Sequence, residues 1–138
     1  MNFLLDTNVV SEWVKPRPNP GLIGWMESTD EDRLFISVVS MAELHYGVGR
    51  MPAGSRRSRL EQWLQHDLRL RFESRILPVD ANVAEAWGRT VSRSEAAGRP
   101  IGAMDAFLAA TAETHELTLV TRNVSDFPML QAILNPWT

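Results

Sequence analysis

Short apolar runs alternate along the chain with longer amphipathic stretches, and this alternation limits the fold more than any other feature. The strand-like runs cover residues 2–5, 34–39, 76–79 and 117–121. Helical periodicity predicts helices over residues 8–14, 21–28, 40–51, 57–73, 81–97 and 103–116. Strands that alternate with helices favour a parallel sheet with helices on both faces. We therefore predict an α/β fold.

Length and composition limit the number of domains, the cellular compartment and the kinds of partner that we expect. A chain of 138 residues without a repeat or a linker is predicted to form one domain, residues 1–138. The absence of cysteine fits a reducing cytoplasm and excludes a thiolate metal site. No apolar stretch approaches the roughly 20 residues that span a bilayer, and Asp6 interrupts any signal-peptide pattern. We expect a cytoplasmic protein with no membrane partner. Its net charge of −3 does not indicate a nucleic-acid binder, although a local basic face remains compatible with that total.

The first strand-like run ends on an acid. Phe3 to Leu5 lead directly into Asp6, and Thr7 and Asn8 follow. In open parallel sheets, ligands bind just beyond the carboxyl ends of the strands. Asp6 is therefore a candidate functional residue.

A second acid lies on an apolar helix face. In the predicted helix 103–116, Asp105 projects among Ile101, Leu108 and Ala112. An ionised carboxylate on an inward face is costly unless it is paired or bound to a cation. Alternatively, Asp105 follows Gly102 closely enough to lie in the first helical turn, where the helix dipole favours negative charge. Both interpretations stay open for this helix alone.

Two further places carry acids or amides with ordinary local explanations. Ser40 and Glu43 have the spacing of a capping box, and this spacing favours a structural role for Glu43. Thr121 ends the last predicted strand, and Asn123 and Asp126 follow it as typical turn residues.

Taken together, these residues indicate a metal site. If the sheet is parallel, the residues that follow its strands share one edge of the domain, and the helix bearing Asp105 adds a further carboxylate. Several carboxylates without a basic partner in the same motifs repel one another, and a hard divalent cation relieves that repulsion. Ligands made only of oxygen suit Mg²⁺ or Mn²⁺.

The motifs in this order resemble the PIN-domain ribonucleases. LLDTNVVSEW, ISVVSMAELHYGVGR, IGAMDAFLAATA and LVTRNVSDF, followed by ILNPW, are similar to VapC-type toxins of bacterial toxin–antitoxin pairs, including the FitB-like branch. The resemblance runs from Met1 to Trp137. It implies a PIN-like three-layer α/β/α fold with a central, mostly parallel sheet of four or five strands.

The resemblance also implies site residues. The acids that the family uses to bind metal fall on Asp6, Glu43 and Asp105. A fourth position falls on Asn123 or on Asp126, and we favour Asp126 as a catalytic residue because it keeps the charge. The supporting side chains expected around these acids are Thr7, Asn8, Thr121 and Asn123.

The activity implied is that of a Mg²⁺-dependent endoribonuclease, with Mn²⁺ as a possible substitute, that cuts structured RNA such as tRNA with a metal-activated water. The implied partners are a VapB-type antitoxin, the RNA substrate and a second copy of the chain, with DNA reached only through the antitoxin. Large apolar residues suggest that Leu44, Tyr46 and Val48, with the helix of Trp63, border either a groove for the antitoxin or the dimer contact.

Arginines are the candidates for RNA binding, because a guanidinium binds phosphate with two hydrogen bonds. The candidates are Arg50, Arg56, Arg57, Arg59 and Arg122. An equally good interpretation is that the cluster at residues 56–59 solvates a loop. The five tryptophans could stack on bases, but their helical spacing favours the core.

Other classes fit less well. Phosphatases of the haloacid-dehalogenase type need a second Asp where this chain has Asn8, and they and receiver domains use a later lysine, whereas Lys15 is the only lysine. A module that binds antitoxin and DNA but has a degenerate nuclease site remains the alternative. The enzyme is expected to cut RNA in the presence of Mg²⁺, whereas such a binding module is not.

Overall fold

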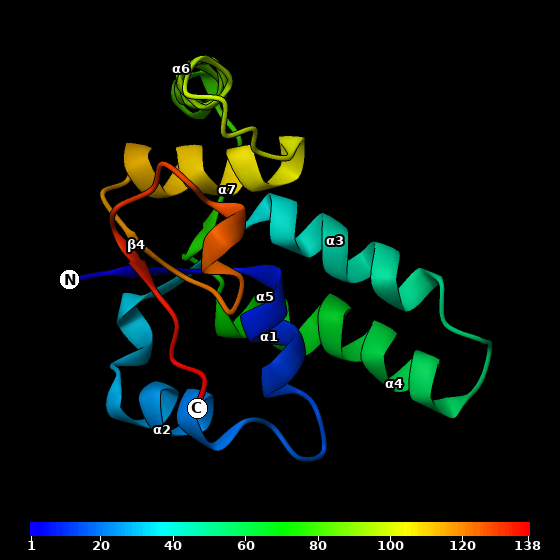
Figure 1. Ribbon diagram of the computed structural model, residues 1–138. Helices are drawn as coiled ribbons and strands as arrows, with labels where there is room; N and C mark the ends of the chain where they lie inside the picture. The colour runs from blue at the N-terminus through cyan, green and yellow to red at the C-terminus, as the bar shows by residue number, and fades with distance from the viewer.

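A five-stranded parallel sheet forms the centre of the computed structural model, which describes residues 1–138 (Figure 1). Its strands are β1 (Phe3–Leu5), β2 (Leu34–Ser37), β3 (Ile76–Leu77), β4 (Thr118–Val120) and β5 (Ile133–Leu134). They lie in the order β3-β2-β1-β4-β5, and every neighbouring pair is parallel. The predicted α/β fold with a parallel sheet is confirmed, and β5 is a strand that periodicity alone did not indicate.

Helices cover both faces of this sheet. They are α1 (Thr7–Trp13), α2 (Pro20–Ser28), α3 (Val38–Gly49), α4 (Ser55–Gln62), α5 (Arg69–Arg71), α6 (Ala81–Ala96) and α7 (Ala103–Thr114). A π-helical segment, η2 (Trp63–Leu68), joins α4 to α5, so the predicted helix 57–73 is one run with a wider middle turn. Short 3₁₀ turns are η1 (Glu31–Arg33) and η3 (Val124–Asp126). No helix is both long and apolar enough to cross a membrane.

The sheet is buried on both faces because the side chains of each strand alternate between two hydrophobic clusters. On β1, Phe3 and Leu5 join a cluster of 13 buried residues with α1, α2, α3 and η2. Leu4, between them, joins a cluster of 8 residues that includes Leu108 of α7. A strand with both faces covered reads as a continuous apolar run, and for this reason β1 is uniformly hydrophobic.

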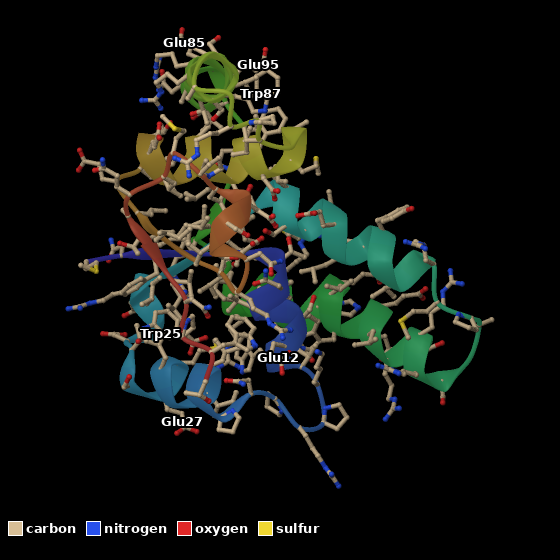
Figure 2. All side chains as sticks on the ribbon, viewed as in Figure 1. Glu12, Trp25, Glu27, Glu85, Trp87 and Glu95 are labelled. Carbon is tan, nitrogen blue, oxygen red and sulfur yellow. The ribbon has the colours of Figure 1, made fainter.

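Helix α6 packs on the outer side of α7 (Figure 1). Trp87 of α6 stacks on Phe107 with ring centroids 5.4 Å apart, and its Nε1–H donates to the carbonyl of Ala103 at 3.0 Å (Figure 2). Trp87 is therefore part of this interhelical contact, and the other four tryptophans pack against the larger core cluster.

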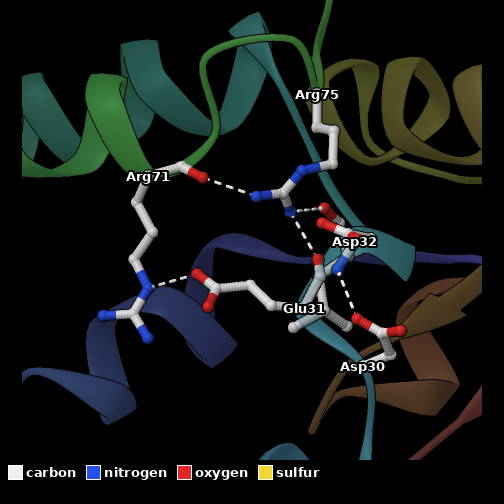
Figure 3. A network of polar contacts seen from close by, with 6 residues as sticks. Asp30, Glu31, Asp32, Arg71 and Arg75 are labelled. Carbon is white, nitrogen blue, oxygen red and sulfur yellow. Dashed lines mark hydrogen bonds and ion pairs between the residues drawn. The ribbon is translucent and has the colours of Figure 1, made fainter.

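Two arginines fix the start of β2 to the segment before β3 (Figure 3). Arg75 donates to the carbonyls of Glu31 and Leu34 at 2.5 and 2.6 Å, and to that of Arg71 at 2.5 Å. Arg71 pairs with the Glu31 carboxylate and lies 4.2 Å from the ring centre of Trp13 on α1. These contacts join α1, β2 and β3, which lie far apart in sequence.

The start of α3 differs from the prediction. Ser37 is the N-cap, and its Oγ accepts from the backbone N–H of Val39 at 3.0 Å. The helix therefore begins at Val38, two residues before Ser40, which is buried inside it. The predicted capping box of Ser40 and Glu43 was wrong because the strand turns into the helix at Ser37. Glu43 is thus left free for contacts outside its own helix.

Candidate active site

The candidate site lies at the carboxyl edge of the sheet, where the strand order reverses around β1. Strand β1 has β2 on one side and β4 on the other. The chain segments that follow β1 and β4 therefore lead away from each other. Asp6 follows β1, and Thr121 follows β4 directly beside it in register. A crevice at such a switch point is the usual ligand site of open α/β sheets.

Hydrogen bonds hold the Asp6 carboxylate in one orientation. The backbone N–H of Thr7 donates to its Oδ1 at 2.6 Å, and the Thr121 hydroxyl donates to its Oδ2 at 2.8 Å. The Asn8 amide donates to the same Oδ2 at 3.3 Å and to the Thr121 hydroxyl oxygen at 3.3 Å. Only 7% of Asp6 is exposed. Of the residues predicted to support Asp6, Asn8 and Thr121 contact its carboxylate with their side chains, and Thr7 contacts it with its backbone N–H.

Thr7 links the first acid to the second. Its hydroxyl donates to Oε1 of Glu43 at 2.6 Å, while its backbone N–H binds Asp6. The start of α1 therefore positions carboxylates from both sides of the β1–α1 turn. This contact, and not a cap, is the local reason for an acid at position 43.

One pocket of about 370 Å³ brings the predicted acids together. Asp6, Glu43, Asp105 and Asp126 all line it, and Asn123 lies in its wall beside Asp126. Asp105 is in the first turn of α7, as the helix-dipole interpretation expected, and it also faces this pocket. Asp105 therefore has the first-turn position of the structural interpretation and also faces the pocket of the other acids.

The four acids have no ion-pairing partner. The ion pairs of the protein join Glu12, Glu61, Glu31 and Glu113 to basic side chains, and none includes Asp6, Glu43, Asp105 or Asp126. Burial, together with the nearby charges of Asp6, Asp126 and Glu43, raises the pKa of Asp105 to about 6. Burial also raises the pKa of Asp6, although hydrogen bonds from Thr121 and Thr7 counteract part of the effect.

The donor atoms suit a hard cation, but the side chains do not form a finished coordination shell. Carboxylate, hydroxyl and amide oxygens are the ligands that Mg²⁺ and Mn²⁺ prefer. No group of three acids or histidines is arranged to hold one ion directly. Binding therefore requires some of the carboxylates to move toward the ion, whereas Asp6 is already fixed by its hydrogen bonds.

Asn123 and Asp126, the two candidates for the fourth site residue, make different contacts. The backbone N–H of Asn123 donates to the Thr121 hydroxyl oxygen at 3.0 Å, so Asn123 supports the residue that binds Asp6. Asp126 lines the same pocket as Asp6 and Asp105, and its charge is among those that raise the pKa of both. This proximity favours Asp126 over Asn123 as the fourth acidic group.

Sequence reasoning missed some residues of this pocket. Ser11, Glu12, Lys15 and Trp137 also line it. The spacing of Glu12 and Lys15, three residues apart on one helical face, is the signal that could have indicated them. Trp137 had been assigned to the core, against which it does pack.

The five candidate arginines lie in different surroundings. Arg122 lines the acid pocket, and Arg56 and Arg59 line a larger groove next to it. Arg57 binds Glu61 at 2.7 Å and the Met51 carbonyl at 3.2 Å. Arg50 lies over the ring of Tyr46 at 5.4 Å.

The larger groove has a volume of about 1130 Å³ and lies between α1, α3 and the run from α4 to η2. Leu44, Val48 and Trp63 line it, as the hypothesis of an apolar groove expected. Tyr46 does not: it is 67% exposed on another side of α3. The groove hypothesis therefore keeps three of its four residues.

Comparison with known proteins agrees with this geometry. The PIN domain family model matches residues 3–128. The chain is 36% identical to Toxin FitB of Neisseria gonorrhoeae and 33% identical to VapC ribonuclease Y4jK of Sinorhizobium fredii, over 98% of the chain and at least 97% of each relative. It is 29% identical to the tRNA(fMet)-specific endonuclease VapC of Shigella flexneri over 92% of the chain and 90% of that protein.

Solved structures give the same result. The structure of FitAB bound to the IR36 DNA fragment contains a chain with a TM-score of 0.92 and 34% identity, covering 99% of this chain and 96% of that one. The order of strands, the acids at the sheet edge and the full-length similarity agree with one another. The chain belongs to the PIN-domain family, as a member of its VapC/FitB group of toxins from toxin–antitoxin systems.

Proposed function

We propose that this protein is a magnesium-dependent endoribonuclease that hydrolyses phosphodiester bonds in structured RNA, with tRNA as the substrate class. The observation that carries the proposal is that Asp6, Glu43, Asp105 and Asp126 share one pocket at the switch point of the sheet and have no ion-pairing partner. Relatives named as ribonucleases and as a tRNA-specific endonuclease support the substrate class.

In this proposal Asp6, Glu43 and Asp105 hold Mg²⁺, or Mn²⁺ in its place. When bound, such an ion lowers the pKa of a water molecule and withdraws charge from the phosphate. Thr121 and the backbone N–H of Thr7 orient the Asp6 carboxylate for this task.

The remaining side chains position these acids and complete the charge of the pocket. The hydroxyl of Thr7 orients Glu43, and the amide of Asn8 fixes both Asp6 and Thr121. Asp126 supplies the fourth negative group. Arg122, Arg56 and Arg59 lie where they can bind the phosphates of an RNA strand entering the pocket.

The proposed partner is a VapB-type antitoxin, whose segment occupies the groove lined by Leu44, Val48 and Trp63. The similar structure of FitAB bound to the IR36 DNA fragment supports DNA contact through the antitoxin. We further propose a homodimer that acts in the cytoplasm.

The test is cleavage of total tRNA by the purified toxin, freed of antitoxin, in Mg²⁺ and in EDTA. We expect cutting only with Mg²⁺ or Mn²⁺, and a loss of at least about 100-fold for Asp6→Asn, because even indirect supporting residues of metal sites contribute about 10–100-fold. Asn keeps an acceptor for Thr7, so the fold should persist. The matched control is Asp32→Asn, since Asp32 is exposed and remote from the pocket.

A second candidate function, a binding module with a degenerate site, is favoured by one observation, the absence of a finished three-acid coordination shell. It predicts tight binding of the antitoxin with no metal-dependent cutting. Cutting that Asp6→Asn abolishes would exclude it.

A further inference from the structure

Lys15, the only lysine of the chain, lies where the acid pocket and the apolar groove meet. It follows the end of α1, and it lines both cavities together with Thr7, Ser11 and Glu43. Its side chain is 55% exposed. A ligand that enters the acid pocket along the groove therefore passes this ammonium group.

A nearly buried carboxylate fixes the position of Lys15. The Lys15 Nζ lies 2.8 Å from Oε1 of Glu12, whose side chain is only 11% exposed (Figure 2). The other carboxylate oxygen, Oε2, accepts from the backbone N–H of Asn19 at 2.9 Å. Glu12 thus binds both ends of the proline-rich turn between α1 and α2, and it holds the lysine on the pocket side.

A second cation, Arg122, lines the same pocket as Glu12. Hydrogen bonds from Lys15 and from Asn19, and the nearby charge of Arg122, lower the pKa of Glu12 although burial acts in the opposite direction. Arg122 is fixed through its backbone, whose N–H donates to Oδ1 of Asn8 at 3.3 Å. The lining of the pocket therefore holds the four unpaired acids, the paired carboxylate of Glu12, and two cations, Lys15 and Arg122.

We infer that Lys15, oriented by Glu12, binds an RNA phosphate next to the one that is cleaved. The inference rests on the proposed function and names a positioning residue for it. A polyanion approaching four carboxylates needs local positive charge, and an ammonium group held at the mouth of the pocket supplies it. Lysine binds phosphate as a point charge without a fixed fork, so it tolerates different RNA sequences.

The binding experiment uses total tRNA and the Asp6→Asn background, so that no cleavage interferes. Affinity is measured at several salt concentrations. Lys15→Ala should reduce the slope of log affinity against log salt by about 0.7–0.9, the contribution of one phosphate contact. Lys15→Arg should retain the slope because it keeps the charge. Arg69→Ala, which removes an exposed positive charge that lines neither cavity, is the matched control and should not change the slope.

The cleavage experiment uses the full chain with Asp6 intact. Lys15→Ala should lower kcat/KM by about tenfold, mostly through a higher KM, because one charge-assisted hydrogen bond to the substrate is lost. Lys15→Arg should restore most of it. If Lys15 only anchors the turn, Lys15→Ala lowers the melting temperature and leaves the salt slope unchanged, which overturns the inference.

The outcomes separate this inference from the proposed function. If the wild-type protein cuts tRNA and Lys15→Ala behaves like Arg69→Ala, only the role of Lys15 is wrong. If the wild-type protein does not cut but the salt slope still depends on Lys15, the phosphate site stands and the nuclease proposal is wrong. Weaker binding of the antitoxin by Lys15→Ala without any effect on tRNA would assign the lysine to the groove and overturn the inference.

Discussion

Helix α1 carries a carboxylate at each end, and the two are in opposite electrostatic states. Asp6 caps the start of the helix among other acids, and its pKa is raised. Glu12 lies in the last turn beside Lys15, and its pKa is lowered. Both side chains are largely buried, so burial alone does not explain the difference. The neighbouring groups of each carboxylate decide the difference between the two pKa shifts.

This comparison shows how a structural acid differs from a candidate functional acid within two helical turns. Glu12 is neutralised by an ion pair inside the protein, which ties a turn to the helix. Asp6 receives hydrogen bonds but no cation from the chain. An acid that the protein itself leaves unpaired retains its charge for a ligand from outside, and such perturbed groups in a cleft are typical of functional sites.

The largest effect is expected when one negative charge is removed from the acid pocket. Asp105→Asn should reduce RNA cleavage by at least about 100-fold while leaving the melting temperature without metal unchanged or slightly higher, because crowded carboxylates repel. Cleavage gels and thermal unfolding in EDTA measure the two effects. A marked drop in melting temperature would contradict the functional role and favour a purely structural acid at the start of α7.

A smaller effect on cleavage is expected at the fourth acidic position, where Asp126 and Asn123 can be compared directly. Asp126→Asn should lower cleavage about 10–100-fold, because it removes a charge near Asp6 and Asp105. Asn123→Ala should change cleavage much less, since its contact with Thr121 uses the backbone N–H. Cleavage rates at saturating Mg²⁺ show which variant loses more activity. A larger loss for Asn123→Ala than for Asp126→Asn would assign the fourth site position to Asn123.

The smallest expected effect is on stability against pH, and it has opposite signs for Asp105 in the acid pocket and for Glu12 in the last turn of α1. The pKa of Asp105 is raised from 3.8 to about 6, so between these values the folded chain holds a proton that the unfolded chain has lost. Stability without metal should therefore rise as pH falls toward about 4, and this gain is lost as pH rises through about 6. Glu12, with a lowered pKa, stabilises above its ordinary value of 4.5, and that contribution is lost as pH falls through its lowered folded value.

Melting temperatures in EDTA across this range check both signs. Asp105→Asn should flatten the slope between about pH 4 and 6, and Glu12→Gln should flatten it only in more acidic solution. If Asp105→Asn leaves the slope unchanged, its carboxyl group is not electrostatically perturbed.

Much of the fold could be predicted because its signals are local. The apolar runs of β1 and β4 and the periodicity of α6 and α7 follow from residues close together in sequence. The start of α3 could not be placed correctly, because Ser37 and Ser40 are both good caps and the end of β2 decides between them. Strand β5 is only two residues long, and its pairing with β4 defines it.

Asp6 and Asp105 could be named from sequence because each stands where an apolar residue was expected, whereas Glu43 and Asp126 had ordinary local explanations and were named through the resemblance to PIN domains. Their convergence was a consequence of parallel strands, and the pocket agrees with it. Glu12 and Lys15 were not assigned, because an ion pair three residues apart on a helix is common and does not reveal that a cavity lies beside it.

The sequence by itself determined the alternation of strands and helices and the identity of the acids, because periodicity and composition are properties of neighbouring residues. Only the tertiary structure decided which acids have partners. Pairing depends on contacts such as Thr121 with Asp6, 115 positions apart, and Thr7 with Glu43, 36 positions apart. Electrostatic state is a property of the whole environment, and that environment exists only in the folded chain.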